Sequence, residues 1–521
     1  MASDFKVIKN RYFDSVFLMR VAQRISDEQG IDEAAALMAT ENNKHLLSNI
    51  GLDTKDPQVQ AASPEDLIVV LKGTDQAAIA RILEDLDQWL TRPPIKAGSF
   101  RARTLEQAIA RLPTANLAVI SVPGQYAARE TKKSLAARRN VFLFSSNVSL
   151  EDEASLKRMA HEQGLLLMGP DCGTAIVNGI GIGFANVVRR GQIGAIGVAG
   201  TGLQEFTSLV HRCGAGISHA LGTGGRDLKD AIGGITTFDA LEALEADNQT
   251  RVIALIAKPP GKHTLAKLAP RLRRSSKPIV ACLLGADPLP EHKPAALHWA
   301  GTIDDAVLAA IRLDGSAEPG GLAQAAEQVE QSISSERTRL AEEQRFIRGL
   351  FAGGTFCYQS QVVLKTWGLK AYSNTPLPGM TPLADPQQSL EHTLIDMGDD
   401  LFTRSRPHPM IDATFRRRRL FSEAYDSQVG VILLDFVLGF NASPDPVGDM
   451  LPAIQEAKSI ASERGAFLSV VASVCGTEQD PQNLEAQVSA LKQAGVIVLP
   501  TNAQAAAFAA QVVLPPNGAS S

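Results

Sequence analysis

Short apolar runs alternate with amphipathic stretches along most of the chain, and this alternation predicts strands separated by helices. The apolar runs are bounded by Gly, Pro or polar residues, as buried strands are, and lie at residues 67–71, 117–122, 141–144, 165–168, 193–199, 217–221, 252–256, 279–284 and 431–440. Helical spacing follows many of them, for example at residues 150–163, where Ser149 is placed to cap the helix. Such alternation predicts α/β domains whose parallel sheets bind ligands at the carboxyl ends of the strands.

Two parts of the chain repeat each other. The segment AIGVAGTGLQEFTSLV at residues 195–210 is echoed by GLFAGGTFCYQSQVVL at residues 349–364, and VIALIAKPPG at 252–261 is echoed by VILLDFVLGF at 431–440. In the first pair a glycine turn ends a strand and opens a helix, which leaves backbone N–H groups unpaired at the positive end of the helix dipole. We therefore expect two flavodoxin-like domains whose helix starts face one shared anion such as phosphate. The plainer alternative is that the glycines only make tight strand-to-helix turns.

The residues expected to hold this anion are glycines and their neighbours in four turns. They are Gly200, Thr201, Gly202, Gly224, Gly225, Arg226, Gly353, Gly354, Thr355, Gly439, Phe440, Asn441 and Ala442. Lys258 follows the apolar run at 252–256 and is assigned a catalytic role, because its charge would stabilise a transferred group that becomes negative. The alternative for Lys258 is a surface lysine ahead of a proline pair.

The same patterns divide the chain into five parts. Residues 1–103 form a small α/β module with a ferredoxin-like or regulatory pattern and no recognisable chemistry, and residues 104–190 form a doubly wound, Rossmann-like domain. The two flavodoxin-like domains span residues 191–314 and 346–521, and residues 315–345 form a linker helix between them. A chain of 521 residues is long enough for roughly three to four cores, which agrees with this division.

Composition limits the partners and the compartment. The sequence is 45% hydrophobic, and its formal net charge of -5 gives no reason to expect nucleic acid or an anionic membrane as partner. The five cysteines are scattered singly, which argues against a disulfide framework or a zinc site. No signal peptide is recognised, and no apolar run reaches the roughly 20 residues of a membrane helix. We expect a soluble, cytoplasmic protein, and we interpret the arginine run at 416–419 as a solvated helix face.

Residues 117–258 resemble the α subunit of succinyl-CoA synthetase. The segments that carry this likeness are VISVPGQYAARE at 119–130, FSSNVSLED at 144–152, LMGPDCGT at 167–174 and GAIGVAGTGLQE at 194–205. The matching positions of its CoA-binding domain are Pro123, Asn147, Pro170, Asp171 and Cys172. For Cys172 itself, packing is the simpler interpretation, since no base is recognisable beside it.

The second half, residues 353–509, resembles the ligase domain of the β subunit, with DMGDD at 396–400 and a facing turn at 435–442. The fusion of both halves behind an N-terminal module, with GGRDL at 224–228 and RSRPHPMID at 404–412, is similar to the FdrA family over nearly the whole chain. The resemblance implies a Rossmann-like CoA-binding-type domain followed by two flavodoxin-like domains of the succinyl-CoA-ligase type.

The sequence departs from the synthetase at the positions that serve its phosphohistidine. The Gly-His-Ala-Gly segment expected after residue 284 is absent, and neither His292 nor His298 has its context. The glutamate that orients the phosphohistidine falls near Lys258, which reverses the charge. The glycine-rich CoA loop and a nucleotide-grasping domain are not recognisable. The sequence thus keeps the glycine turns expected to bind phosphate but lacks the histidine segment that would carry the phosphoryl group.

This combination implies direct handling of a carbamoyl or acyl phosphate. FdrA-type proteins are associated with purine and allantoin nitrogen catabolism, where a related assembly acts as oxamate carbamoyltransferase and interconverts oxalurate plus phosphate with oxamate plus carbamoyl phosphate. One alternative is an ADP-forming acyl-CoA synthetase whose nucleotide domain is on another chain, and another is a non-catalytic scaffold subunit. Both enzyme readings imply a small-molecule substrate and hetero-oligomeric partner subunits.

Further candidates lie in the turn at 396–400 and the loop that follows. Arg404 and Arg406 are expected to grip a carboxylate substrate, and they and His408 are assigned catalytic roles, the alternative being an ion-paired structural loop. The carboxylates of Asp396, Asp399 and Asp400 would suit Mg²⁺ or simple helix capping. We assign no metal site and no certain cofactor: phosphate or carbamoyl phosphate is expected at the glycine turns, and CoA and Mg²⁺ stay open.

Overall fold

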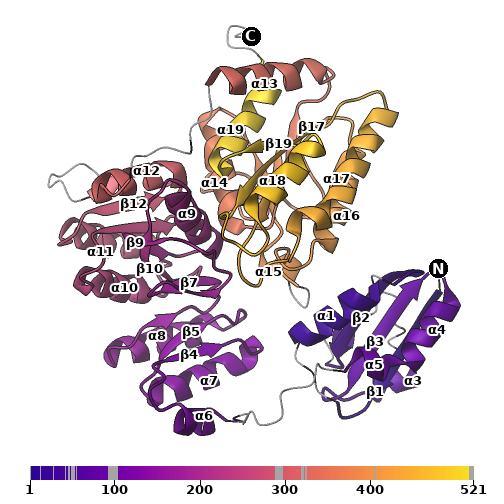
Figure 1. The fold of residues 1–521 in the computed structure, drawn as a ribbon, viewed down its shortest axis with the longest axis horizontal. Coiled ribbons are helices and arrows are strands. Elements are labelled where there is room, and N and C mark those ends of the chain that lie inside the picture. Colours follow the sequence, from indigo (N-terminus) through magenta and orange to yellow (C-terminus); the bar gives the residue numbers. More distant parts are fainter. Residues whose placement is uncertain are drawn as a thin grey trace. The chain divides into compact units, whose positions relative to one another are not determined.

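The computed structural model describes residues 2–11, 13, 15–26, 28–40, 43–44, 47, 53, 55–91, 102, 104–287, 297–317, 322, 326–403 and 407–515. The chain divides into two compact units, Met1–Arg103 with Thr403–Pro407, and Thr104–Phe402 with His408–Ser521. Figure 1 labels helices and strands of both units where there is room.

The N-terminal unit is a small antiparallel sheet with helices, in the strand order β1-β3-β2. Its elements are β1 (Ala2–Ile8), α1 (Ser15–Ser26), β2 (Ile31–Met38), α3 (Pro57–Gln60), β3 (Leu67–Gly73), α4 (Gln76–Glu84) and α5 (Leu86–Trp89). Buried Leu67, Val69 and Leu71 of the central strand pack with Leu18 and Ile25 of α1. The α/β fold predicted for the N-terminal module is confirmed over its described residues.

The second unit begins with a three-stranded parallel sheet in the order β4-β5-β6. Its elements are α6 (Leu105–Arg111), β4 (Leu117–Ile120), α7 (Gly124–Ala136), β5 (Asn140–Leu143), α8 (Leu150–Glu162) and β6 (Leu167–Met168). The predicted cap of α8 is confirmed, because the backbone N–H of Asp152 donates to Ser149 Oγ at 3.0 Å.

A seven-stranded sheet follows, in the order β13-β12-β11-β9-β10-β7-β8. Its strands are β7 (Thr174–Val177), β8 (Ile180–Gly183), β9 (Arg190–Gly197), β10 (Ile217–Gly222), β11 (Val252–Ala257), β12 (Ile279–Leu283) and β13 (Leu297–Trp299). The helices α9 (Gly200–Arg212) and α12 (Ile303–Asp314) pack on one face, and α10 (Ile235–Ala246) and α11 (Lys262–Arg273) on the other. The antiparallel hairpin β7–β8 joins β10, so this sheet begins upstream of the boundary expected at residue 191.

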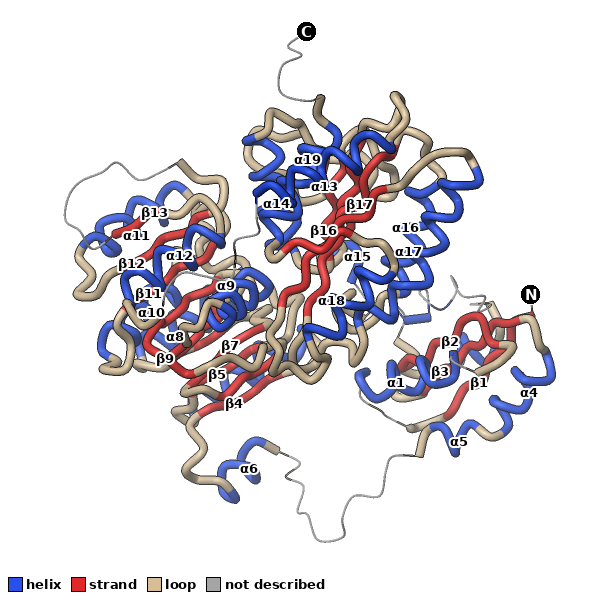
Figure 2. The backbone as a smooth tube through the Cα atoms, turned by 45° about the horizontal axis from the view of Figure 1, so that its top comes forward, coloured by secondary structure: helices blue, strands red, loops and turns tan. Residues whose placement is uncertain are grey.

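The third sheet is parallel throughout, in the order β15-β16-β14-β17-β18-β19. Its strands are β14 (Phe346–Phe351), β15 (Tyr372–Ser373), β16 (Thr393–Asp396), β17 (Val429–Val437), β18 (Ser469–Cys475) and β19 (Ile497–Leu499). Its helices are α13 (Ala326–Arg339), α14 (Gly354–Thr366), α15 (Asp400–Thr403), α16 (Thr414–Ala424), α17 (Pro446–Glu463), α18 (Leu484–Gln493) and α19 (Asn502–Val513). Figure 2 shows α16 and α17 on one face of this sheet, and α14 and α19 lie on the other.

The two large sheets share one topology, which confirms the internal repeat. In the first copy β9 lies between β10 and β11, with β12 and β13 beyond β11. In the second copy β14 lies between β16 and β17, with β18 and β19 beyond β17, and the two-residue β15 adds an outer strand beside β16. This is the flavodoxin-like order that the sequence predicts. The first helix of each copy, α9 or α14, contacts the other, so the amino ends of both helices meet between the two sheets.

Buried polar groups hold the two flavodoxin-like domains together. Glu205 of α9 is 2% exposed, and its Oε1 accepts a hydrogen bond from the backbone N–H of Asn502 at 3.2 Å. Nearby, Thr501 Oγ1 donates to Asp304 Oδ2 at 2.6 Å. Burial is the main cause that raises the pKa of Glu205 to about 7 and that of Asp304 to about 6.

Replacing Glu205 by glutamine is expected to weaken the pH dependence of stability. Because the pKa of Glu205 in the folded protein, about 7, exceeds its ordinary value of 4.5, its contribution to stability is complete below pH 4.5 and is lost as pH rises through about 7. Each pKa unit corresponds to about 1.4 kcal/mol. In urea denaturation, the free energy of unfolding of Glu205→Gln relative to that of the wild type should be higher at about pH 8 than at about pH 5. Parallel pH profiles of the two proteins would contradict this.

Candidate functional site

The amino ends of α9 and α14 face each other closely. The backbone N–H of Thr355 donates to Thr201 Oγ1 across the two domains at 3.4 Å. A Cβ placed on Gly202 would lie 2.8 Å from Thr355 Cγ2, and one placed on Gly353 would lie 3.0 Å from Thr201 Cβ. The glycines are therefore required by the approach of two helices, which is more than a single tight turn demands.

Neither helix start has a cap that satisfies its first turn. The N-cap positions are Ala199 for α9 and Gly353 for α14, and neither helix has a side-chain capping bond. Thr355 is 3% exposed, and its Oγ1 has no hydrogen-bond partner in the part of the chain that the structure describes. Two positive helix ends without side-chain caps and a buried hydroxyl form a site suited to a small oxyanion, although the N–H of Thr355 is already used by Thr201 Oγ1.

Asp435 fixes the turn that leads into α14. Its carboxylate accepts hydrogen bonds from the backbone N–H groups of Ala352 and Gly353, both at 2.8 Å. Arg416 Nη2 pairs with the same carboxylate at 2.7 Å, and Arg416 Nε donates to the carbonyl of Leu350 at 2.8 Å. This positioning role was not predicted from the sequence, although a lone Asp inside the apolar run at 431–440 is a signal for it.

The interpretation of the arginine run at 416–419 as a solvated helix face is wrong for two of its members. Arg416 is 3% and Arg419 6% exposed. Arg416 pairs with Asp435, and Arg419 Nε pairs with Glu423 at 2.5 Å. At helical spacing, residues three apart lie on one face, and here that face turns toward the sheet.

Lys258 lies at the carboxyl end of β11, beside α14. Its Nζ lies 5.0 Å from the centroid of the Tyr358 ring. Burial raises the pKa of the Asp396 carboxyl at the end of β16, and the charge of Lys258 opposes this rise. The structure therefore brings Lys258 to the domain that carries the second helix start, and it is only partly buried there.

Carboxyl groups surround the same strand ends. Asp396 is 6% exposed, and burial, aided by Asp399 and opposed by Lys258, raises its pKa to about 6. Asp171, which is exposed, lies within reach of the charges of Asp400 and Arg226. Asp396 thus titrates close to neutral pH.

The turn after β16 uses its carboxylates for local hydrogen bonds. Asp396 Oδ1 accepts from the N–H of Gly398, and Asp399 Oδ1 accepts from the N–H of Leu401, each at 3.0 Å. Within the described residues no group of three or more His, Cys, Asp or Glu side chains is arranged to hold a metal ion. Capping, the plainer of the two interpretations, accounts for these bonds.

Two of the four predicted anion turns have their polar groups engaged elsewhere. At Gly224–Arg226, a Cβ on Gly224 would lie 2.3 Å from the carbonyl oxygen of Pro170, and Arg226 Nη2 pairs with Glu153 Oε2 at 2.7 Å. Gly225 itself is exposed and close to Asp171. This turn therefore packs on the first sheet, and its arginine is held in an ion pair.

The turn at residues 439–442 ties the two flavodoxin-like domains together. The N–H of Gly439 donates to Gln482 Oε1 at 3.0 Å, and that of Phe440 donates to the carbonyl of Ala185 at 2.9 Å. Asn441 Nδ2 donates to the carbonyl of Gly183 at 2.8 Å, and Ala442 follows, half-buried. These donors are used within the protein, so the prediction that this turn holds an anion receives no support from its geometry.

The positions matched to a CoA-binding domain lie on three loops, which follow β4, β5 and β6. Pro123 and Asn147 are exposed at the carboxyl ends of β4 and β5. Pro170 and Cys172 are buried, and Cys172 Sγ donates to the carbonyl of Gly222 at 3.3 Å. Burial raises the pKa of the Cys172 thiol to about 12, which agrees with a packing role.

Of the predicted carboxylate-gripping residues, Arg404 and Arg406 lie outside the described residues. His408 accepts a hydrogen bond at Nδ1 from the N–H of Met410 at 3.2 Å, and burial lowers its pKa to about 4. The imidazole is therefore neutral at pH 7, and the catalytic role of His408 stays a prediction.

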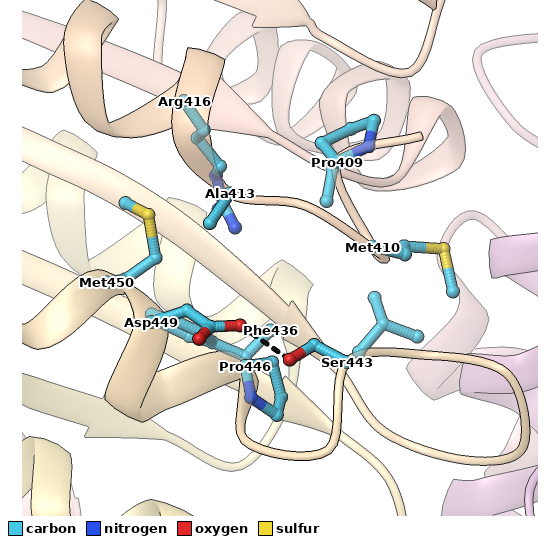
Figure 3. A pocket seen from close by; sticks show the side chains of 11 residues that line it. Pro409, Met410, Ala413, Arg416, Phe436, Ser443, Pro446, Asp449 and Met450 are labelled. Carbon is cyan, nitrogen blue, oxygen red and sulfur yellow. Dashed lines mark hydrogen bonds between the residues drawn. The ribbon is translucent and has the colours of Figure 1, made fainter. Parts of the chain in front are cut away.

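A small cavity lies beside this loop (Figure 3). Pro409 and Met410 border it from the loop, Arg416 from α16, and Asp449 accepts a hydrogen bond from Ser443 Oγ at 2.5 Å on its other side. Its volume of about 10 Å³ holds little more than one water molecule. The cavity is therefore too small for a carboxylate substrate.

Comparison with known proteins places this geometry in a family. A family model described as CoA-ligase matches residues 350–512, and one described as AllF, heavy metal-associated domain, matches residues 1–104. Protein YahF of Escherichia coli (strain K12) is 44% identical over 497 residues, which cover 94% of this chain and 95% of YahF. Subunit alpha 1 of succinate–CoA ligase [ADP-forming] of Archaeoglobus fulgidus is 27% identical over 217 residues, which cover 40% of this chain and 72% of that subunit.

Among solved structures, dinucleotide-forming acetyl-coenzyme A synthetase 1 of Ca. Korarchaeum cryptofilum in its apo form is similar over 76% of this chain and 82% of that one, with 16% identity and a TM-score of 0.31. No helix in the described part of this chain is both long and apolar enough to span a membrane.

The residues that match the heavy metal-associated domain, 1–104, contain no cysteine. All five cysteines of the sequence lie beyond residue 171. Any metal held by residues 1–104 would therefore need ligands other than thiolates.

The repeat, the paired helix starts and the near full-length similarity to YahF agree with one another. The chain belongs to the family of YahF, the FdrA-type proteins, which fuse succinyl-CoA-synthetase-like α- and β-type ligase domains behind a small N-terminal domain.

Proposed function

We propose that this chain is an enzyme subunit that binds a carbamoyl or acyl phosphate between the amino ends of α9 and α14. The observation that carries the proposal is the pair of uncapped helix starts around the unpartnered Thr355 hydroxyl. Gly200, Thr201 and Gly202 on one side, and Gly354 on the other, would offer first-turn N–H groups to a phosphoryl oxygen, whereas the N–H of Thr355 is taken by Thr201 Oγ1.

The reaction that fits this site best is phosphorolysis of a carbamoyl amide, as in oxamate carbamoyltransferase. A phosphate oxygen attacks the carbamoyl carbon of oxalurate, the bond between that carbon and the amide nitrogen breaks, and oxamate leaves with a proton on its nitrogen. The products are oxamate and carbamoyl phosphate. Lys258 supports this reading, because its positive charge lies beside α14, where the transferred group becomes negative.

An ADP-forming acyl-CoA synthetase subunit is the second candidate. The match of residues 350–512 to the CoA-ligase model favours it, as does the similarity of the first half to a succinate–CoA ligase α subunit. In that case a partner chain would supply the nucleotide site.

Isothermal titration of the purified chain with carbamoyl phosphate, oxamate and CoA separates the two candidates. Binding of carbamoyl phosphate without CoA supports carbamoyl transfer and makes reconstitution with partner subunits the next step. Tight CoA binding without carbamoyl phosphate supports the synthetase instead. A chain that binds none of the three would act as a scaffold.

Thr355→Val tests the hydroxyl at the centre of the site. Valine keeps the shape of threonine, so we expect phosphate affinity to fall roughly tenfold, the equivalent of one hydrogen bond of about 1.4 kcal/mol. Thermal stability should not decrease, because the hydroxyl has no partner within the described residues. Titration with inorganic phosphate measures the change, and Thr366→Val in the last turn of the same helix is the control. Unchanged phosphate affinity in Thr355→Val would remove the hydroxyl from the site.

A further inference from the structure

Asp396 is a carboxyl group that lies against the start of α14. It is the last residue of β16 and pairs with Phe351 of β14, two positions before the N-cap of α14. A Cβ placed on Gly354, the first residue of α14, would lie only 2.4 Å from Asp396 Oδ2. The carboxyl therefore packs directly against the helix start.

One oxygen of this carboxyl accepts no hydrogen bond from the described residues. Asp396 Oδ1 accepts from the N–H of Gly398, whereas Oδ2 accepts no hydrogen bond from the part of the chain that the structure describes. The other carboxyl at this end of the sheet, Asp435, is fully engaged with two N–H groups and Arg416. Asp396 thus differs from its neighbour in having an oxygen that no structural bond uses.

The fold does not require a carboxylate at this position. In the first flavodoxin-like domain the equivalent residue is Gly222, which pairs with Gly197, again two positions before the N-cap of the helix. There a side chain has no room, since a Cβ on Gly222 would lie 2.5 Å from Cys172 Sγ. The acid is present in one copy of the repeat only, where the two helix starts meet.

We infer that Asp396 is the proton-exchanging group of the paired-helix site: it takes up a proton when a divalent oxyanion binds, and it passes that proton to the leaving nitrogen. This inference rests on the proposed function. As phosphate attacks the carbamoyl carbon, the carbon–nitrogen bond breaks and the nitrogen takes the proton of Asp396. The hydroxyl proton of the attacking phosphate then returns to Asp396, so the group is regenerated.

The charges around Asp396 set its proton affinity. Lys258, after β11, favours the ionised form, and acidic groups on neighbouring elements oppose it. These acidic groups are Asp399 in the turn, Asp435 in β17 and, one step further away, Asp171 and Asp400. A bound dianion adds further negative charge beside Oδ2, which favours proton uptake at neutral pH.

Sulfate is the probe that isolates this proton, because it is a tetrahedral dianion that does not titrate near pH 7. Calorimetric titration at pH 7 in two buffers of different ionisation enthalpy counts the protons taken up on binding. We expect uptake by the wild type and its loss in Asp396→Asn, which keeps the acceptor for Gly398. Asp449→Asn is the matched control, since Asp449 is a carboxyl of the same domain whose pKa burial also raises. Its uptake should equal that of the wild type.

The outcomes separate the two hypotheses. Sulfate binding with equal proton uptake in the wild type and Asp396→Asn would overturn the role of Asp396 and leave the anion site standing. Loss of uptake in Asp449→Asn as well would overturn the assignment to Asp396. Absence of both sulfate and phosphate binding in the wild type would overturn the proposed function and the inference with it. Lys258→Gln is a second variant, in which maximal uptake should shift to higher pH; an unshifted maximum would contradict the pairing of these groups.

Discussion

Gly202→Val is expected to abolish phosphate binding and to lower turnover roughly 100-fold or more, the size of effect seen when oxyanion donors are displaced. The reason is steric: a Cβ at this position would already lie 2.8 Å from Thr355 Cγ2 and 3.4 Å from Ile256 Cγ2. Two further methyl groups would push the start of α9 away from that of α14. The N–H groups of the two helices could then no longer converge on one phosphoryl group. Titration with phosphate and a turnover assay measure the two effects.

Two other variants show whether the effect is local. Gly202→Ala adds only the first carbon and should give a smaller loss of the same kind. Gly301→Ala is the control, because a Cβ there meets only Asp305 Oδ2 at 3.7 Å, an ordinary contact, before the start of α12. Circular dichroism should show the fold retained in all three. Wild-type phosphate affinity in Gly202→Val would remove the paired-helix site from consideration.

Arg416→Met is expected to lower the free energy of unfolding by about 3–5 kcal/mol, the usual loss when one partner of a buried ion pair is removed. The variant leaves the carboxylate of Asp435 buried without its cation and frees the carbonyl of Leu350. The turn of Ala352 and Gly353 depends on that carboxylate, so anion binding should weaken as well. Guanidinium denaturation gives the first quantity and phosphate titration the second.

The same helix provides the control. Arg418 is exposed in α16, and Arg418→Met should change the unfolding free energy by about 0.5 kcal/mol or less. If both variants proved equally mild, the burial of Arg416 would have no energetic consequence, and the role given to Asp435 would have to be withdrawn.

Much of the fold could be predicted because the strands of parallel sheets are apolar throughout. All nine residues of β17 are buried, and the run that encodes it is visible in the sequence without any partner. The repeat was also visible in the sequence, because both copies place a glycine turn directly after an apolar first strand. The hairpin β7–β8 was not predicted, because its pairing with β10 is an antiparallel addition that the βαβ pattern does not encode.

The site could be predicted only in part. Glycines at 200–202 and 353–354 mark the helix starts, and the structure brings them together. The glycines at 224 and 439 look the same in the sequence, yet they serve close packing against Pro170 and Ala185. Which N–H groups remain unpaired depends on contacts between residues far apart in the chain. Asp396, Asp435 and Arg416 were hidden for the same reason, since their roles depend on side chains from other strands and helices.

The helices α9 and α14, whose amino ends face each other, belong to one polypeptide chain, and this affects how the site is assembled. When two halves of a site lie on separate subunits, the fraction of complete sites falls with dilution. Here the second half is tethered to the first, and its effective concentration is set by the length of the connecting chain, on the order of millimolar for flexible tethers. Every folded chain therefore carries both helix starts in a one-to-one ratio, whatever its abundance. A partner subunit would change what the site does, but it would not be needed to bring the two helix starts together.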